Sequence, residues 1–287
     1  MPAYYAQASC QEFETFPRLR MAATALRTRE DWLLCMISDS ALPTGGFVSS
    51  GGLEAAVQAG HVTSSSLLAY MNASVHSYAH SGVPYVRAAW QCLEESRAGE
   101  GIDLDGIISK LTGLDHGCDV LTGTNHIARR ASRAQGAAYL TLAVRGFPTE
   151  RGIVIVKAFK TEVRASRTPG HLVLCFAIVC WCLGIPLDRT EHLLVFLYVR
   201  SLLSAAIRLN LVGPYQGQQL LLALQKEVEH ALRLVQRRME GHHIPQQSLA
   251  GPDTISIAAA TLACQTSPVV DILQGLHGQL YSRMFNS

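Results

Sequence analysis

Three cysteines within eight residues are the first candidates for chemistry in this chain. Cys175, Cys180 and Cys182 offer thiolates, which are good ligands for zinc and other thiophilic metals. On a helix that turns about 100° per residue, however, Cys175 and Cys182 share a face and Cys180 lies about 140° away. One helix therefore cannot bring all three sulfurs to one ion, and the apolar surroundings favour buried, inert thiols.

Histidines provide the second candidate metal site. The neighbours His242 and His243 lie in a polar segment, and His230 precedes them on a predicted helix. Imidazole is a common ligand for transition metals, but no cysteine or carboxylate completes the set. A solvated histidine pair near a hinge is the favoured interpretation, and the sequence predicts no metal site.

The motifs of nucleotide-binding and hydrolytic proteins are missing from the sequence. It contains no G-x-x-x-x-G-K-[ST] loop and no Gly-Lys pair, so it lacks the phosphate cradle of a P-loop GTPase. It also contains no G-x-G-x-x-G, no G-x-S-x-G, no H-E-x-x-H and no paired C-x-x-C. These absences argue against a catalyst and favour a binding protein.

Two arginines lie on a predicted helix that is otherwise apolar on nearly every face. Arg200 and Arg208 must be paired or reach a surface, because an unpaired buried charge is costly. A structural ion pair, a hydrogen bond to a helix C-terminal carbonyl and a contact with a partner protein are all compatible with this placement. Arg129, Arg130 and Arg133 form a more ordinary pattern, for which a solvated helix face is expected.

The most unusual local feature is the loop Leu42–Phe47. Pro43 is followed at once by the pair Gly45 and Gly46, a combination that bends the backbone between helices. Exposed backbone N–H groups in such a loop can bind an anion, but no lysine stands at phosphate spacing. A tight turn between helices is the favoured interpretation.

These residues must be positioned by helices. The composition is 48% apolar and only 16% charged, which excludes general disorder and suits a chain with a sizeable core. Apolar periodicity predicts one all-α helical-bundle domain of about eight to ten helices over 29–287. The predicted helical segments are Trp32–Ile37, Leu53–Ala59, Thr63–His80, a helix carrying Tyr85 and Trp90, one from Ile107, Asn125–Ala143, Leu172–Leu183, Thr190–Asn210, Gln218–Met239, Ile255–Cys264 and Val269–Gln279.

Other segments read as breaks in this pattern. Gly82 and Pro84 predict a helix boundary. Residues 146–170 read as a connector, in which the β-branched run Ile153–Val156 predicts a short strand. Residues 1–28 read as a poorly ordered N-terminal extension, and residues 241–254 as a polar hinge.

Charge and hydropathy predict the compartment. The formal charge of +2 is too small for a nucleic-acid or membrane footprint. The longest apolar run, Leu172–Ile185, is shorter than the roughly 20 residues that span a bilayer. Residues 1–28 have no apolar core typical of a signal peptide. We therefore expect a cytoplasmic protein that binds neither nucleic acid nor membrane.

Four blocks in fixed order resemble the UreF family of urease accessory proteins. The loop and the start of the next helix, a middle helix, the end of the central helix and the C-terminal tail carry this resemblance. The blocks are Ser38–Phe47 with Ser50–Glu54, Ala128–Ser132 with Gln135 and Gly136, Ser204–Pro214, and Gln274–Ser287. Many members have an aromatic residue or histidine where this chain has Ser49.

The resemblance implies an all-helical adaptor that dimerises and has no reaction of its own. In the family, UreF binds a second accessory protein, UreD (also called UreH). Together they recruit the nickel-carrying GTPase UreG to apo-urease, so nickel is handled through the complex and no cofactor is bound stably. The resemblance carries no role to residues 1–28 or 146–170.

The family motifs also indicate which residues shape loops or contact partners. They are Pro43, Gly45, Gly46, Phe47, Glu54, Arg208, His277, Tyr281, Ser282 and Arg283. The tail from Gln274 to Ser287 is expected to form a short amphipathic helix that is mobile alone and orders on a partner. Two alternatives stay open: a helical enzyme with a pocket of His277, Tyr281 and Arg208, and a helical scaffold unrelated to nickel.

Overall fold

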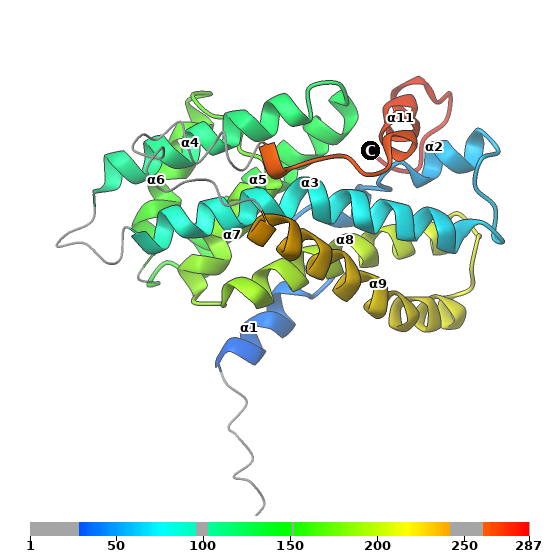
Figure 1. Ribbon diagram of the computed structural model, residues 1–287, viewed down its shortest axis with the longest axis horizontal. Coiled ribbons are helices and arrows are strands. Elements are labelled where there is room, and N and C mark those ends of the chain that lie inside the picture. Colours follow the sequence, from blue (N-terminus) through cyan, green and yellow to red (C-terminus); the bar gives the residue numbers. More distant parts are fainter. Residues whose placement is uncertain (1–28, 96–102, 151, 242–260, 287) are drawn as a thin grey trace, which may run out of the picture.

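The fold is entirely helical in the part of the chain that can be described. The computed structural model describes residues 29–95, 103–150, 152–241 and 261–286, and within these ranges it contains ten α-helices and no strand (Figure 1). This confirms the predicted all-α class. The helices are α1 (Arg29–Ile37), α2 (Leu53–Gln58), α3 (Leu67–Glu95), α4 (Leu104–Leu121), α5 (His126–Gly146), α6 (Ile153–Arg164), α7 (Leu172–Leu183), α8 (Leu187–Arg208), α9 (Pro214–Gly241) and α11 (Pro268–Leu276), with 3-10 turns η1 (Gly46–Val48) and η3 (His277–Gln279).

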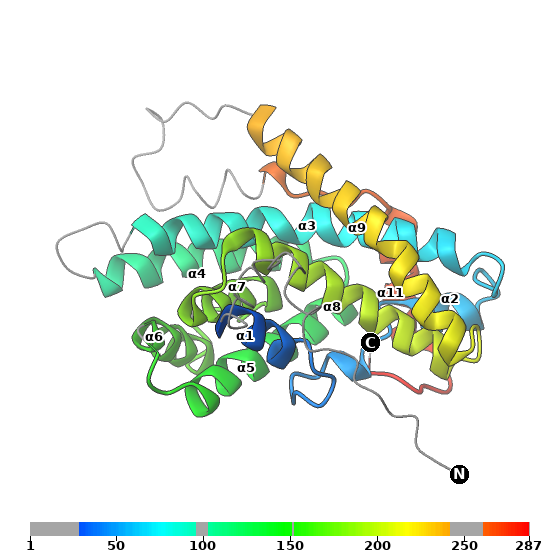
Figure 2. The same cartoon turned by 90° about the horizontal axis from the view of Figure 1, so that it is seen from below.

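Two apolar clusters form the core. The α7 cluster gathers side chains of α4, α5, α6 and α7 with the C-terminal half of α3. The α9 cluster gathers side chains of α2, α9 and α11 with the N-terminal half of α3. Helices α3 and α8 contribute to both clusters, and Figures 1 and 2 show α3 running along the molecule with α9 packed against it.

Helix α7 is the buried centre of the first cluster. Every residue from Val173 to Cys180 is buried, as predicted for this apolar run. The three candidate cysteines are buried free thiols, and burial raises the pKa of Cys182 to about 11. A protonated thiol is a poor nucleophile and a poor ligand. The prediction that these three cysteines are buried in the core is confirmed.

Among the described helices, α8 is the one long and apolar enough to cross a membrane. More than half of its most apolar window, 56%, is buried inside the protein. That burial is what the predicted central helix of a bundle requires.

The predicted boundary at Gly82 and Pro84 is wrong. Helix α3 continues through Pro84 to Glu95. Proline removes one helical N–H donor and so leaves the carbonyl of His80 without its usual partner. The backbone N–H of Cys264 donates to that carbonyl at 3.2 Å, and Gly82 lets Val173 of α7 approach closely. Packing from distant residues therefore makes an unbroken helix tolerable.

The predicted strand at Ile153–Val156 is also wrong, and residues 146–170 are more than a connector. The run begins α6, on which Ile155, Val156 and Phe159 are buried in the α7 cluster. Four β-branched residues fit a strand locally, but Phe159 continues the apolar face at helical spacing, and burial of that face decides the outcome.

Several predictions lie outside the described residues. These are the N-terminal extension 1–28, the His242-His243 pair with most of the hinge at 241–254, and most of the predicted helix Ile255–Cys264. The predicted helix start at Asn125 is confirmed, since its side chain accepts a hydrogen bond from the Ala128 N–H at 3.0 Å.

Candidate functional site

The glycine loop is held in shape by α8. Gly45 adopts a φ of +75°, which favours glycine, and the 3-10 turn Gly46–Val48 follows. The Ser201 hydroxyl lies 2.7 Å from the carbonyl oxygen of Gly46 and 3.0 Å from that of Ser49. The N–H groups of Val48 and Ser49 bond to carbonyls inside the loop. This arrangement agrees with a tight turn rather than an anion nest.

The next two glycines allow the C-terminal helix to approach. Gly51 and Gly52 have φ values of +56° and +87° just before α2. A Cβ on Gly52 would lie 2.9 Å from the Cα of Gln274 on α11, closer than side-chain carbons approach backbone. The glycines therefore bring the start of α2 into direct contact with the C-terminal region.

Glu54 on α2 is the hydrogen-bonding centre of this contact. Its side chain is buried, and its Oε2 lies 2.8 Å from Nε2 of His277 on η3. Its two oxygens also accept the backbone N–H groups of Met284, at 2.6 Å, and of Phe285, at 3.2 Å. One carboxylate thus holds three groups of the C-terminal tail, as a buried charge must have several partners.

His277 is fully buried and contacts Glu54 through one nitrogen. Its Nδ1 has no hydrogen-bond partner among the described residues. The tautomer that carries its proton on Nε2 donates to Glu54 and leaves no donor unsatisfied. The side chain therefore links η3 to α2 in the interior and does not face a cavity.

Arg208 at the end of α8 joins the loop to the tail. Its guanidinium carbon lies 4.0 Å from the ring centroid of Phe47 and 4.0 Å from that of Phe285, and Nη2 donates to the carbonyl of Phe47. Burial lowers the pKa of Arg208, and partial desolvation strengthens cation–π attraction. Of the alternatives left open for Arg208, the structure shows contacts within the chain, namely two aromatic rings and a backbone carbonyl.

The predicted tail helix is present only in its first part, since Gln274–Leu276 ends α11 and His277–Gln279 forms η3, whereas residues 280–286 form a non-helical strap. Helix α11 ends at Leu276, and after η3 the backbone becomes extended at Leu280. The N–H of Asn286 donates to the carbonyl of Val48 at 2.8 Å, and Phe285 is buried. The helix prediction is wrong for the strap because the N–H groups of residues 284–286 bond to Glu54 and to Val48 instead. The described tail residues bond to their own chain, and the mobility of the tail stays a prediction.

The remaining predicted residues lie at the surface of this junction. Pro43 is exposed, and the side chain of Tyr281 is fully exposed. Arg283 is exposed and donates to the carbonyl of Gly278 at 2.6 Å, while the carbonyl of Ser282 accepts from the Gln58 amide at 3.1 Å.

A cavity of about 390 Å³ lies beneath the loop. Phe47, Tyr139, Phe176 and Arg200 are among its lining residues. Burial raises the pKa of Tyr139 to about 12, so that its hydroxyl stays neutral at physiological pH. Polar side chains such as Thr44, Gln135 and Ser201 share the lining with the aromatic rings, so the cavity is mixed in character.

The predicted solvated arginine face is wrong for two of its three members. Arg129 and Arg133 both pair with Asp119 of α4, and His171 Nε2 lies 2.9 Å from the same carboxylate. Although partial burial opposes the shift, these hydrogen bonds hold the pKa of Asp119 well below its usual value. The third, Arg130, donates to the carbonyl of Asn286 at 2.8 Å and so anchors the tail.

Comparison with known proteins identifies the family. The family model described as UreF matches residues 62–225, which is more than half of the chain. The chain belongs to the UreF family. It is 33% identical to urease accessory protein 6 of Cryptococcus neoformans var. grubii, over 93% of this chain and 100% of that protein. It is 30% identical to urease accessory protein F of Arabidopsis thaliana, over 89% of this chain and 92% of the relative.

UreF membership and the geometry together decide against the enzyme alternative. The named relatives are accessory proteins rather than enzymes, and this chain is likewise not an enzyme. His277 is buried on Glu54, Tyr281 points into solvent, and Arg208 lies between two rings. None of these three residues lines the cavity, so they do not form the pocket that an enzyme would need.

The UreF-like motifs indicated four residues, and the structure brings them to one junction of the glycine loop, α2, α8 and the tail. They are Phe47, Glu54, Arg208 and His277. Sequence reasoning missed the side chains that complete it, namely Ser201, Phe285, Gln58 and Arg130. The apolar Phe285 in a polar tail was the available signal, because a large ring near a terminus is commonly buried.

Proposed function

We propose that this chain is an adaptor in urease maturation. In this proposal it binds the accessory protein UreD/UreH, dimerises within the complex, and recruits the nickel-carrying GTPase UreG to apo-urease in the cytoplasm. Nickel is cargo of the complex. The family membership supports a role in urease maturation, and the absence of a P-loop in the sequence is consistent with a separate GTPase.

The observation that carries the proposal is the docked C-terminal strap with its exposed side chains. Tyr281 and Met284 are exposed apolar residues of the strap, which Glu54 and Arg208 hold through Met284 and Phe285. Val269 and Ile272 of α11 are exposed as well. Aromatic residues, methionine and arginine are enriched at protein interfaces. A preorganised surface of this kind loses little conformational entropy when a partner binds.

The proposal is tested in cells that lack this chain but still produce urease. We expect urease activity to fall to background, to return with the wild-type gene and to recover in part with excess nickel. Affinity capture of the tagged wild-type chain should bring down UreD/UreH and UreG. Normal urease activity in the deletion cells would refute the proposal.

Arg283→Ala separates partner binding from folding. Arg283 is exposed and donates to two backbone carbonyls of its own turn, those of Gly278 and Leu280. Because these are local contacts at the surface, we expect the melting temperature to change by less than about 2 °C. Capture of UreD/UreH should weaken about tenfold, as for an interface arginine of moderate importance.

The matched control for Arg283 is Arg237→Ala, which removes an exposed arginine of α9. It should change neither the melting temperature nor partner capture. If Arg283→Ala melts several degrees lower and still captures the partner, Arg283 is a structural residue and the strap is not the docking surface.

A further inference from the structure

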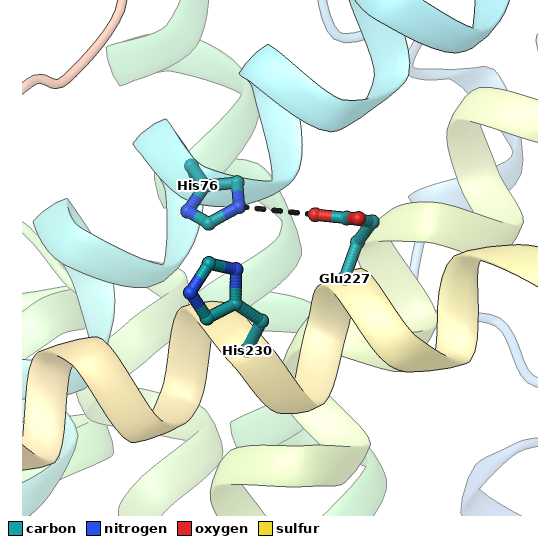
Figure 3. Close-up of side chains that lie close together, drawn as sticks. All are labelled: His76, Glu227 and His230. Carbon is teal, nitrogen blue, oxygen red and sulfur yellow. Dashed lines mark hydrogen bonds and ion pairs between the residues drawn. The ribbon is translucent and has the colours of Figure 1, made fainter.

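Two imidazoles and a carboxylate meet where α3 packs on α9. Figure 3 shows His76 of α3 facing Glu227 and His230 of α9. One ligand atom from each of the three side chains lies within 4.8 Å of the others. The Nε2 of His76 is 3.4 Å from Oε2 of Glu227, and the rings of His76 and His230 meet edge to face at 5.5 Å between centroids.

The helices hold these three side chains in place. Glu227 and His230 are three residues apart, so they project from the same face of α9, an arrangement that helical bundles use for metal ligands. The neighbouring Val228 and Ala231 are buried in the α9 cluster and fix the rotation of α9. Next to His76, Val75 is buried in the same cluster and fixes α3. The cluster therefore rests on packed backbone rather than on a loop.

A hydrogen bond between His76 and Glu227 explains only part of this geometry. Their separation of 3.4 Å is longer than an ordinary N–H···O bond. Two ligand atoms that are each about 2.1 Å from one metal ion lie about 3.0–3.4 Å apart at octahedral or tetrahedral angles. The pair is thus already spaced as two ligands of one ion, and His230 supplies a third group that the hydrogen bond does not need.

We propose that His76, Glu227 and His230 form a site for a divalent transition-metal ion. Two imidazoles and one carboxylate suit zinc, nickel, cobalt or copper, whereas magnesium and calcium prefer oxygen ligands alone. Three protein ligands leave positions for water, as in exchangeable sites rather than closed structural ones. Glu227 and His230 are accessible to solvent, so an ion can enter and leave without unfolding.

A further histidine supports the first ligand. His80, one turn after His76 on α3, stacks on the His76 ring with centroids 6.1 Å apart. Its Nδ1 lies 2.8 Å from the backbone carbonyl of His76. The hydrogen bond fixes the orientation of the His80 ring, which lies beside one face of the His76 ring.

The sequence alone suggested a different group of candidate metal ligands. It grouped His230 with His242 and His243 and found no carboxylate to complete the set. The fold supplies the carboxylate from Glu227, one turn earlier on α9, and an imidazole from α3. Only the packing of two helices that are distant in the sequence reveals this combination.

The test uses the full-length chain without a histidine tag. Titration calorimetry with Ni²⁺ and with Zn²⁺ should show one site per chain for at least one of the two ions. His76→Ala, His230→Ala and the conservative Glu227→Gln should each weaken that site at least about tenfold. The wild-type chain should also gain melting temperature with the ion, and His76→Ala should not, because binding to the native state stabilises it.

Two controls keep the result specific. His192→Ala removes an exposed histidine of α8 and should leave binding unchanged. The double change His242→Ala/His243→Ala should also leave this site intact. If the double variant loses binding while Glu227→Gln keeps it, or if the wild-type chain binds neither ion, the proposed site is wrong. Because the measurement uses the isolated chain, it stands apart from the proposed role in urease maturation.

Discussion

Changing Glu54 to alanine is expected to release the C-terminal strap and to lower the free energy of unfolding by about 3 kcal/mol. The change removes the acceptor of His277 Nε2 and of the N–H groups of Met284 and Phe285. A buried donor that loses its acceptor costs about 1–3 kcal/mol, and here the Nε2–H of His277 and two backbone N–H groups lose theirs together. Urea denaturation measures the loss, and hydrogen exchange of the amides in residues 280–286 measures the release.

Glu54→Gln is the matched control. It keeps the size of the side chain and one carbonyl oxygen, but it replaces the second acceptor by a donor. We expect a smaller loss of stability and faster exchange at whichever of the Met284 and Phe285 amides loses its acceptor. If the amides of 280–286 in Glu54→Ala stay as protected as in the wild-type chain, Glu54 does not hold the strap.

The Glu54 variants also connect the junction to function. Glu54 holds the backbone of Met284, whose exposed side chain belongs to the proposed docking surface. Release of the strap should therefore lower capture of UreD/UreH even where the remaining helices stay folded. Arg283→Ala, by contrast, should lower capture with little loss of stability, so the two variants separate the support of the surface from its contacts.

Some of the fold could be predicted because burial leaves a local pattern. The run Leu172–Leu183 is apolar on every face, and it forms the buried centre of one cluster. The predicted helix Gln218–Met239 has one apolar and one polar face, and Leu224, Val228 and Val235 of the apolar face are buried in α9. The sequence of α9 therefore shows which face meets the core, and that of α7 shows that nearly every face does.

Other features depend on partners that are distant in the sequence. Nothing near Pro84 shows that the N–H of Cys264 will reach the carbonyl of His80. Likewise, Arg129 and Arg133 read as a solvated face until α4 places Asp119 beside them. The family motifs indicated that Glu54 and His277 matter, but they did not show that the two side chains are in contact, because order along a sequence gives no distance between residues.

Gly136→Ala is expected to lower the free energy of unfolding by about 3 kcal/mol or more. A Cβ at this position of α5 would lie 2.1 Å from the carbonyl oxygen of Gly170 and 3.0 Å from Sγ of Cys175. Overpacking a tight core costs about 1–3 kcal/mol and more where the neighbours cannot move. Urea denaturation and the melting temperature measure the effect.

The neighbours of Gly136 are unable to move without further loss. The N–H groups of Gly170 and His171 both donate to the carboxylate of Asp115, which is fully buried. A shift of this backbone would break those bonds, so α5 must move away from α7 instead. Gln135, next to Gly136, lies beside Gly45 and Gly46, and the displacement therefore reaches the glycine loop.

Gly146→Ala provides the control on the same helix. At that position a Cβ would meet only Leu142, at an ordinary distance of 3.7 Å, so stability should change by no more than about 0.5 kcal/mol. Equal stability of the two variants would mean that α5 and α7 are not as closely packed as the structure has them. If Gly136→Ala alone is destabilised, and hydrogen exchange also rises in the loop at residues 44–49, then the packing of α5 on α7 positions the loop that Arg208 connects to the strap.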